Sequence, residues 1–157
     1  MGFGLSTAPA HAAPNLSVSC HIVMRPVSDG KYTDGFPAQQ SIDVQGVVTM
    51  SQAAAQDSIN HGYTVQLRYW GDDPSSDDLL YGPIAAPNVF AAADGLHYQH
   101  NVALAHSVLD EDNTLGVMDD SWGVATEEDE IYVGARFLDP SGKTVSLMES
   151  NRIVGTF

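Results

Sequence analysis

The stretch LHYQHNVALAHSVL, residues 96–109, decides the fold class of this chain. Apolar or aromatic side chains alternate in it with polar ones, and a period of two residues is that of a β-strand with one buried face. The buried face is predicted to carry Leu96, Tyr98, His100, Val102, Leu104, His106 and Val108.

The same alternation recurs along the rest of the chain. Further strands are expected over residues 16–24, 42–48, 63–69 and 131–137, with one or two more within 145–157. Roughly seven or eight strands joined by turns rich in Gly, Pro and Asp are typical of an all-β protein. The sequence therefore predicts a single antiparallel β-sandwich.

One segment breaks the period of two. SQAAAQDSINHGY, residues 51–63, has three consecutive alanines, with Ser51 placed as a helix N-cap and Gly62 where a helix would stop. We expect one short helix there, packed on the sandwich. The stretches 26–40 and 82–95 are rich in turn residues, and we interpret both as ordered loops.

Length and composition indicate one globular domain. The chain has 157 residues, of which 43% are hydrophobic and 17% charged, so a sizeable core can form. The first residues end in Ala10-His11-Ala12, the small-x-small pattern of a signal peptidase site. We interpret residues 1–13 as a signal-peptide remnant and 14–157 as the domain of a secreted or cell-envelope protein. No later apolar stretch reaches the roughly 18 residues of a membrane span.

The charge and the cysteine content exclude several kinds of partner. Six basic residues stand against twenty acidic ones, and the resulting net charge of −14 repels nucleic acid phosphates. Cys20 is the single cysteine, so neither an intramolecular disulfide nor a cysteine-rich zinc site can form. We expect Cys20 to be a small buried hydrophobic residue.

The acidic residues gather in three short segments. Thirteen of the twenty lie in 72–78, 110–120 and 127–130. Crowded carboxylates repel one another, and calcium, which takes roughly six to eight oxygen ligands, relieves that repulsion. Loops gather at the ends of a sandwich, so residues remote in sequence can meet there. We expect a calcium site with ligands from Asp73, Asp77, Asp78, Asp112, Asp119, Asp120 and Asp129.

The acidic segments have two alternative interpretations, an EF-hand loop and solvated turns. An EF-hand loop beginning at Asp110 is excluded, because Leu115 and Ser121 stand where that loop has Gly and Glu. Solvated turns, in which Asp side chains accept bonds from nearby N–H groups, stay open as the alternative. For Glu127, Glu128 and Glu130 the solvated reading is favoured, because consecutive carboxylates cannot all face one ion.

Two segments resemble a known family of calcium-binding domains. VQLRYWGDDPSSDDLLYG, residues 65–82, is similar to the third calcium loop of the protein kinase C conserved-region-two type, a calcium- and lipid-binding β-sandwich. DEIYVGARFLDPSGKTV, residues 129–145, resembles the strand that follows that family's first calcium loop, although the two segments come in reverse order. The resemblance implies calcium and a sandwich. Its loop positions correspond to Trp70, Asp73, Ser76, Asp78, Leu79 and Gly82.

The histidines and nucleophiles do not predict an enzyme. His97 and His100 are three residues apart, so on a strand they point to opposite faces and cannot chelate one ion. Neither an HExxH nor a Gly-x-Ser-x-Gly motif is present. Trp70 and Trp122 sit beside acidic segments, where each either closes the end of a sandwich core or offers a platform for sugar.

The sequence thus favours a secreted calcium-binding β-sandwich module that is structural or binds a partner, and is not catalytic. Calcium ions and an extracellular protein or glycan are the expected partners. Two alternatives stay open. One is a metal-independent, immunoglobulin-like adhesion or cell-envelope module, and the other is a small carbohydrate-binding or carbohydrate-active domain that uses Trp70 or Trp122.

Overall fold

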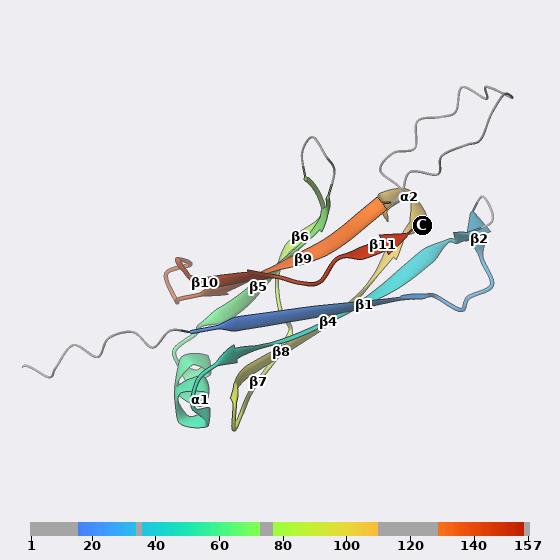
Figure 1. Cartoon of the computed structure of the whole chain (residues 1–157). Helices are drawn as coiled ribbons and strands as arrows, with labels where there is room; N and C mark the ends of the chain where they lie inside the picture. Colours follow the sequence, from blue (N-terminus) through green and yellow to red (C-terminus); the bar gives the residue numbers. More distant parts are fainter. Residues whose placement is uncertain (1–15, 34–35, 73–76, 110–128, 156–157) are drawn as a thin grey trace, which may run out of the picture.

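Two antiparallel sheets packed face to face form the body of the protein, which we describe from a computed structural model (Figure 1). The structure describes residues 16–33, 36–72, 77–109 and 129–155. One sheet has the order β1-β4-β8-β7 and is made of β1 (Val18–Pro26), β4 (Gln39–Thr49), β8 (Gly95–Ala105) and β7 (Asn88–Ala92).

The second sheet has the order β10-β9-β5-β6, and β11 also pairs with β9. Its strands are β5 (Thr64–Gly71), β6 (Asp78–Ala85), β9 (Asp129–Leu138), β10 (Thr144–Glu149) and β11 (Ile153–Gly155). A separate two-stranded hairpin joins β2 (Tyr32–Thr33) to β3 (Phe36–Pro37). The predicted all-β sandwich is confirmed.

The core lies between the two sheets and is built from alternate residues of each strand. Ile42, Val44 and Val48 of β4 face Val65, Leu67 and Tyr69 of β5 across this core, and all six are buried. Residues between them on each strand point outward, as the period of two requires. The inward sets predicted for residues 42–48, 63–69 and 131–137 are therefore those that the structure buries.

The ring of Tyr98 is held inside the sandwich by a glycine on the neighbouring strand. Gly46 lies opposite Tyr98 and Cys20 in the register, and the Tyr98 hydroxyl donates a hydrogen bond of 2.6 Å to the backbone oxygen of Ser19. A Cβ at Gly46 would lie 2.2 Å from that hydroxyl. Cys20 is half-buried against the core, and burial raises the pKa of its thiol to about 11. The expectation of an unreactive thiol is in keeping with that burial.

The predicted helix is present, and its start is where the sequence places it. Helix α1 (Gln52–Asn60) begins after Ser51, whose Oγ accepts a hydrogen bond of 3.2 Å from the backbone N of Ala54. Gly62, with φ of +84°, follows the last turn. The helix packs against β7 and β8 with Ala55 buried. Within the described ranges, no helix is both long and apolar enough to cross a membrane.

Two predictions at strand boundaries are wrong. Residues 82–95 were expected to be a loop, but they contain the end of β6 and all of β7, whose strands are too short for a clear alternation. The strand expected to reach Val108 ends at Ala105, and α2 (His106–Leu109) forms one helical turn. His106 and Leu109 are buried by that turn.

The edge strand β1 is covered by a side chain from the opposite sheet. Asn151, between β10 and β11, accepts a hydrogen bond of 2.9 Å from the backbone N of Ile22 and donates one of 3.2 Å to its backbone oxygen. Nearby, the Ser146 hydroxyl donates a bond of 3.2 Å to the backbone oxygen of Leu16. These contacts join the two sheets along one side.

The substitution Gly46→Ala should destabilise the fold, because its Cβ would lie 2.1 Å from the Ser19 backbone oxygen and 2.2 Å from the Tyr98 hydroxyl. We expect a loss of about 1–3 kcal/mol in the free energy of unfolding, measured by equilibrium urea denaturation. Gly134→Ala on β9 is the matched control, since its Cβ would meet nothing closer than Trp70 Nε1 at 3.4 Å. Equal losses in the two variants would contradict this account.

Candidate functional site

Two of the acidic segments meet in space at one end of the second sheet. Strand β5 ends at Gly71, which lies opposite Asp78 at the start of β6 and opposite Ile131 near the start of β9. The backbone N of Asp72 donates a hydrogen bond of 2.8 Å to the backbone oxygen of Glu130. Residues about sixty positions apart in the chain are thus neighbours, because antiparallel pairing aligns these strand ends.

We call this end of the sheet, made of Asp72, Asp77, Asp78, Asp129 and Glu130, the acidic end. Tyr132 donates a hydrogen bond of 2.7 Å from its hydroxyl to Asp77 Oδ2. Burial, followed by the bond to Asp77, raises the pKa of Tyr132, so the hydroxyl keeps its proton. Asp78 is exposed, whereas Asp72, Asp129 and Glu130 are half-buried.

Arg152 places a positive charge beside the acidic end. Its Nε donates to Asp72 Oδ2, its Nη2 lies 3.7 Å from Glu149 Oε2, and its guanidinium carbon lies 4.7 Å from the centre of the Tyr132 ring. One arginine cannot balance this group of carboxylates. The acidic end therefore keeps a negative potential that favours a bound cation.

Three of the seven predicted calcium ligands lie at the acidic end: Asp77, Asp78 and Asp129. The other four, Asp73, Asp112, Asp119 and Asp120, fall outside the described residues. Within the described part of the chain, no group of three or more His, Cys, Asp or Glu side chains is arranged to hold a metal ion. The calcium site stays a prediction. The structure shows only that the strand ends which carry three of its expected ligands lie next to one another.

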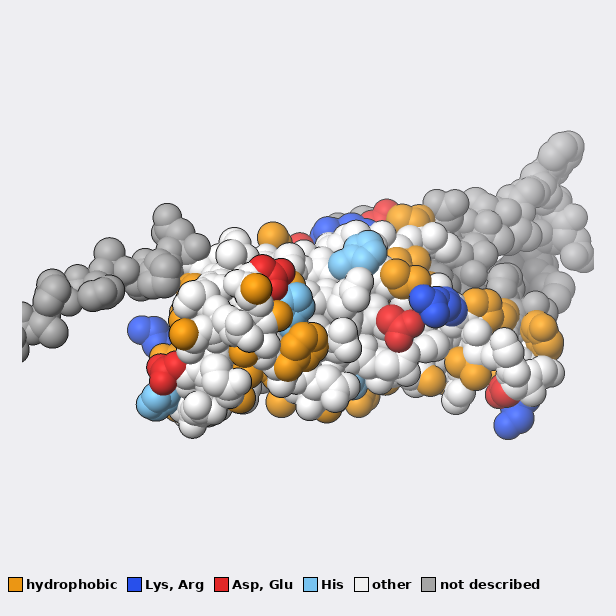
Figure 2. Space-filling view, turned by 90° about the horizontal axis from the view of Figure 1, so that it is seen from below, with side chains coloured by type: hydrophobic (Ala, Val, Ile, Leu, Met, Phe, Trp, Pro, Cys, Tyr) orange, Lys and Arg blue, Asp and Glu red, His pale blue; other side chains and the backbone are white. Residues whose placement is uncertain are grey.

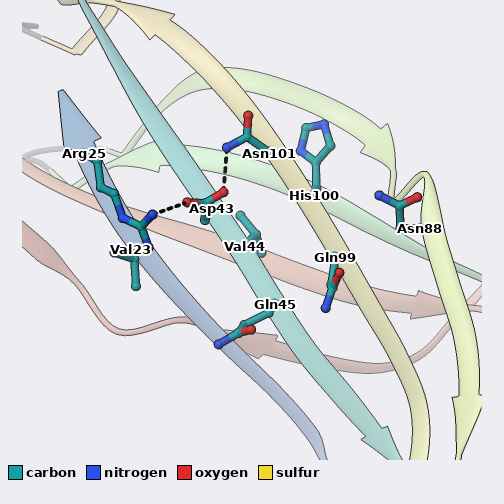
Figure 3. A pocket seen from close by; sticks show the side chains of 9 residues that line it. All are labelled: Val23, Arg25, Asp43, Val44, Gln45, Asn88, Gln99, His100 and Asn101. Carbon is teal, nitrogen blue, oxygen red and sulfur yellow. Dashed lines mark hydrogen bonds and ion pairs between the residues drawn. The ribbon is translucent and has the colours of Figure 1, made fainter. Parts of the chain in front are cut away.

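A second candidate site lies on the outer face of the β1-β4-β8-β7 sheet. Figure 2 views the molecule from this side and shows a largely uncharged polar surface, with few acidic or basic side chains. A hollow of about 340 Å³ lies here. Figure 3 shows its lining, which includes Arg25 on β1, Asp43 and Gln45 on β4, Asn88 on β7, and Gln99 and Asn101 on β8.

A chain of polar contacts fixes one side of this hollow. The Arg25 guanidinium lies 3.9 Å from Asp43 Oδ2, and Asn101 Nδ2 donates a bond of 2.6 Å to Asp43 Oδ1 and one of 2.8 Å to Ser41 Oγ (Figure 3). In contrast, no hydrogen bond within the described residues engages the amides of Gln45 and Gln99. Both amides are exposed and offer a donor and an acceptor to a ligand.

The polar surface continues into a neighbouring hollow of about 310 Å³, which shares Gln45 and Gln99 and adds Ser19, His21 and His97. Phe90, 45% exposed, stacks on His97 with ring centres 5.1 Å apart. An exposed ring beside amides and hydroxyls combines stacking with hydrogen bonding, as sugar recognition requires.

Sequence reasoning missed this face, although its signal was present. The period of two that identifies Val44, Tyr98 and Leu104 as core residues also assigns Gln45, Gln99 and Asn101 to the opposite side. The outward positions carry no cluster of charge, so they did not stand out as the acidic segments did. Of the two roles considered for Trp70, it does not close the core, because it lies half-buried on the outer face of the other sheet.

Comparisons with known proteins assign no function to these sites. No protein-family model and no curated protein matches the sequence. Among solved structures, the X-ray structure of Northeast Structural Genomics Consortium target SoR45 is similar, with a TM-score of 0.45 and 7% sequence identity, over 90% of this chain and 87% of that one. A likeness at this level carries no argument about function. The resemblance to conserved-region-two domains stays a prediction.

A buried histidine lies at the border between the first hollow and the core. His100 lines the hollow with part of its surface, and its Nδ1 is hydrogen-bonded to the Tyr69 hydroxyl across the sandwich at 2.6 Å. The Tyr81 ring stacks on the imidazole with centres 6.4 Å apart. Burial disfavours the charged imidazolium and lowers the pKa of His100.

The lowered pKa predicts a loss of stability in mild acid. Below the usual histidine pKa of about 6.5 the unfolded chain takes up a proton that folded His100 resists, so the stability is complete above that pH and falls below it. Urea denaturation between pH 8 and pH 5 should show a shallower fall for His100→Gln than for the natural chain. His61→Gln, on the exposed end of α1, should keep the natural slope; an unchanged slope in His100→Gln would refute the assignment.

Proposed function

We propose that this protein is a non-catalytic, exported β-sandwich module whose acidic end binds calcium. The observation that supports the proposal is the meeting of the end of β5 with the starts of β6 and β9, joined by the bond between Asp72 N and Glu130 O. Two of the three acid-rich segments of the sequence border on this point. The carboxylates gathered there, which are exposed or half-buried, repel one another, and a cation in addition to Arg152 would relieve that repulsion.

Calcium suits the chemistry of this end better than a transition metal does. The side chains present are carboxylates, joined by strand-end carbonyl oxygens, and hard oxygen ligands favour calcium. The described acidic end contains no histidine or cysteine that would favour zinc. Extracellular modules of this kind bind calcium at about 0.1–1 mM, so a partly exposed site is sufficient.

The role we assign to calcium is structural. Bound between strand ends, the ion would hold Asp77 and Asp78 at the start of β6 against the start of β9, and so fix a surface for an extracellular protein or glycan. Asp77 is already placed by Tyr132, and Asp78 has no partner among the described residues. Asp77 would therefore offer the ion a carboxylate held in place by a hydrogen bond, and Asp78 would offer an exposed one.

A thermal melt tests the calcium site. If the site binds at about 1 mM, then 10 mM calcium should stabilise the protein by about 1.4 kcal/mol, which is a rise of about 3–6 °C in melting temperature. The double variant Asp77→Asn/Asp78→Asn should lose this rise, because it removes two carboxylates from the acidic end.

Three controls make the result specific. Asp57→Asn removes an exposed carboxylate from α1, far from the strand ends, and should keep the full rise. Magnesium at the same concentration should give a smaller rise, since it demands a tighter octahedral site. A rise that is equal for calcium and magnesium, or that survives in the double variant, would mean that general charge screening acts and not a site.

A second candidate function is the binding of a neutral carbohydrate on the outer face of the β1-β4-β8-β7 sheet. The supporting observation is the pair of adjoining hollows that share the exposed amides of Gln45 and Gln99, next to the Phe90–His97 stack. Amides recognise sugar hydroxyls by donating and accepting together, and the exposed ring supplies a surface for an apolar sugar face. This function does not need the metal.

Titration with neutral oligosaccharides, followed by NMR, tests the carbohydrate face. Cello-, xylo- and manno-oligosaccharides are the probes, and signals of β4 and β8 should shift. Gln99→Ala should weaken binding about fivefold or more, as expected for the loss of one or two ligand hydrogen bonds. Gln56→Ala, on α1, is the matched control and should bind as the natural chain does. Shifts confined to other strands would exclude this face.

A further inference from the structure

The outer face of the β10-β9-β5-β6 sheet, at the top of Figure 1, gathers positive charge on an acidic protein. The chain has six basic residues and a net charge of −14. Three of its four arginines, Arg68, Arg136 and Arg152, lie on or beside this face. Because Asp72 and Glu149 already pair with Arg152, Arg68 and Arg136 are the cations on this face that can attract an anion.

A glycine opens a hollow in the middle of this face. Across the sheet, Glu149 of β10 lies opposite Gly134 of β9, and Gly134 lies opposite Arg68 of β5. Because Gly134 has no side chain, a hollow of about 190 Å³ forms there. The Trp70 indole borders it, with Nε1 3.4 Å from the place where a Cβ of residue 134 would stand. Its other walls are Tyr132, Arg136 and Leu147.

Arg68 is the unengaged cation of this hollow. No hydrogen bond or ion pair holds its guanidinium within the described residues, and its Nε is buried without a partner. The Oε1 of Gln66, the next outward residue of β5, is buried without a partner as well. Arg136 and Arg152 differ, because Thr144 engages the first and Asp72 engages the second. A buried donor left unpaired is costly unless a ligand completes it.

We propose that this hollow binds a sugar ring that carries a carboxylate. The Arg68 guanidinium faces the carboxylate, since its planar fork matches the two oxygens of that group. The Trp70 indole and Leu147, which is 61% exposed, cover the apolar side of the ring. Glu149 accepts hydrogen bonds from ring hydroxyls on the far side of Gly134.

The size and charge of the hollow select this class of ligand among anions. Its volume is below the roughly 300–1,000 Å³ of pockets that hold drug-sized molecules, so it admits about one ring. Glu149 within the hollow and the surrounding net charge of −14 disfavour phosphates and nucleic acids. One carboxylate on one ring is the anion that Arg68 can neutralise. A free uronic acid and a uronate at the end of a polysaccharide share this chemistry.

Isothermal titration calorimetry with defined sugars tests the proposal. The probes are glucuronate, galacturonate and the oligomers of each, compared with glucose and with the methyl ester of glucuronic acid. The natural chain should bind the carboxylates and should bind the ester and glucose about tenfold more weakly or not at all. Tighter binding of oligomers than of monomers would identify the polysaccharide as the source, and equal binding would identify the free acid.

The titrations are run in EDTA and repeated with calcium in its place, which separates this hollow from the proposed calcium site. Binding that requires calcium would overturn the assignment to Arg68, whereas failure of the calcium proposal leaves this one unaffected. Arg68→Gln should weaken glucuronate binding about tenfold, and Arg68→Lys should weaken it less because the charge is kept. Lys31→Gln, which removes an exposed positive charge just before β2, is the matched control and should bind normally.

The ester comparison uses only the natural chain, so the test holds even if an Arg68 variant does not fold. If the ester binds as tightly as glucuronate, the proposal is overturned, because the carboxylate then contributes nothing to the affinity. The absence of glucuronate binding up to about 10 mM, the weak end of useful recognition, also overturns it. Unchanged binding in a folded Arg68→Gln variant overturns it as well.

Discussion

The structure depends on the packing of two inner sheet faces against each other. The strands β4 and β5 bury alternate residues in that layer, so the position of each outward residue on them is fixed by its inward neighbours. The tightest part of the layer is the crossing of Tyr98 over Gly46, where ring and backbone are too close for any other side chain. The Tyr69–His100 bond joins the two sheets nearby through polar atoms. The hydrogen bond there satisfies groups that burial would otherwise penalise.

Fixing the inner layer leaves three surfaces of different chemistry. The strand ends collect carboxylates, the outer face of the β1-β4-β8-β7 sheet presents uncharged amides, and the other outer face presents arginines around a tryptophan. None of these surfaces is built by a single segment of chain. Each takes residues from at least three strands, so its geometry is only as firm as the pairing between those strands. The acidic end and the arginine face adjoin at Tyr132, whereas the amide face lies on the opposite sheet.

The core and the helix could be predicted from the sequence because both depend on local periodicity. Residues 42–48 and 63–69 alternate without interruption, and Ser51 and Gly62 mark the ends of α1. Residues 82–95 could not be assigned, because Gly82, Pro83 and Pro87 are typical of loops while the short β7 gains its place by pairing with β8. The place of Trp70 depends on Gly134, which is remote in sequence. Pairing between distant strands is what one sequence does not reveal.

The candidate sites show the same limit. The crowding of carboxylates in the sequence predicted this acidic region. The structure adds that the backbone of Asp72 bonds to that of Glu130, and that Arg152 and Tyr132 engage the carboxylates of Asp72 and Asp77. Among the residues that the structure describes, nothing bonds to the guanidinium of Arg68, and its Nε is buried. The sequence shows where carboxylates are crowded along the chain. Whether a buried polar atom has a hydrogen-bond partner can be seen only when its neighbours in the fold are known.

The side-chain amide of Asn151 takes the place that the backbone of a further strand would have beside the edge strand β1. It supplies one acceptor and one donor to the outward backbone groups of Ile22, as an adjoining peptide would. A foreign chain that sought to lengthen the sheet at β1 would first have to expel that amide from its place. This side of the protein therefore resists templating of further copies, the step from which fibrils grow.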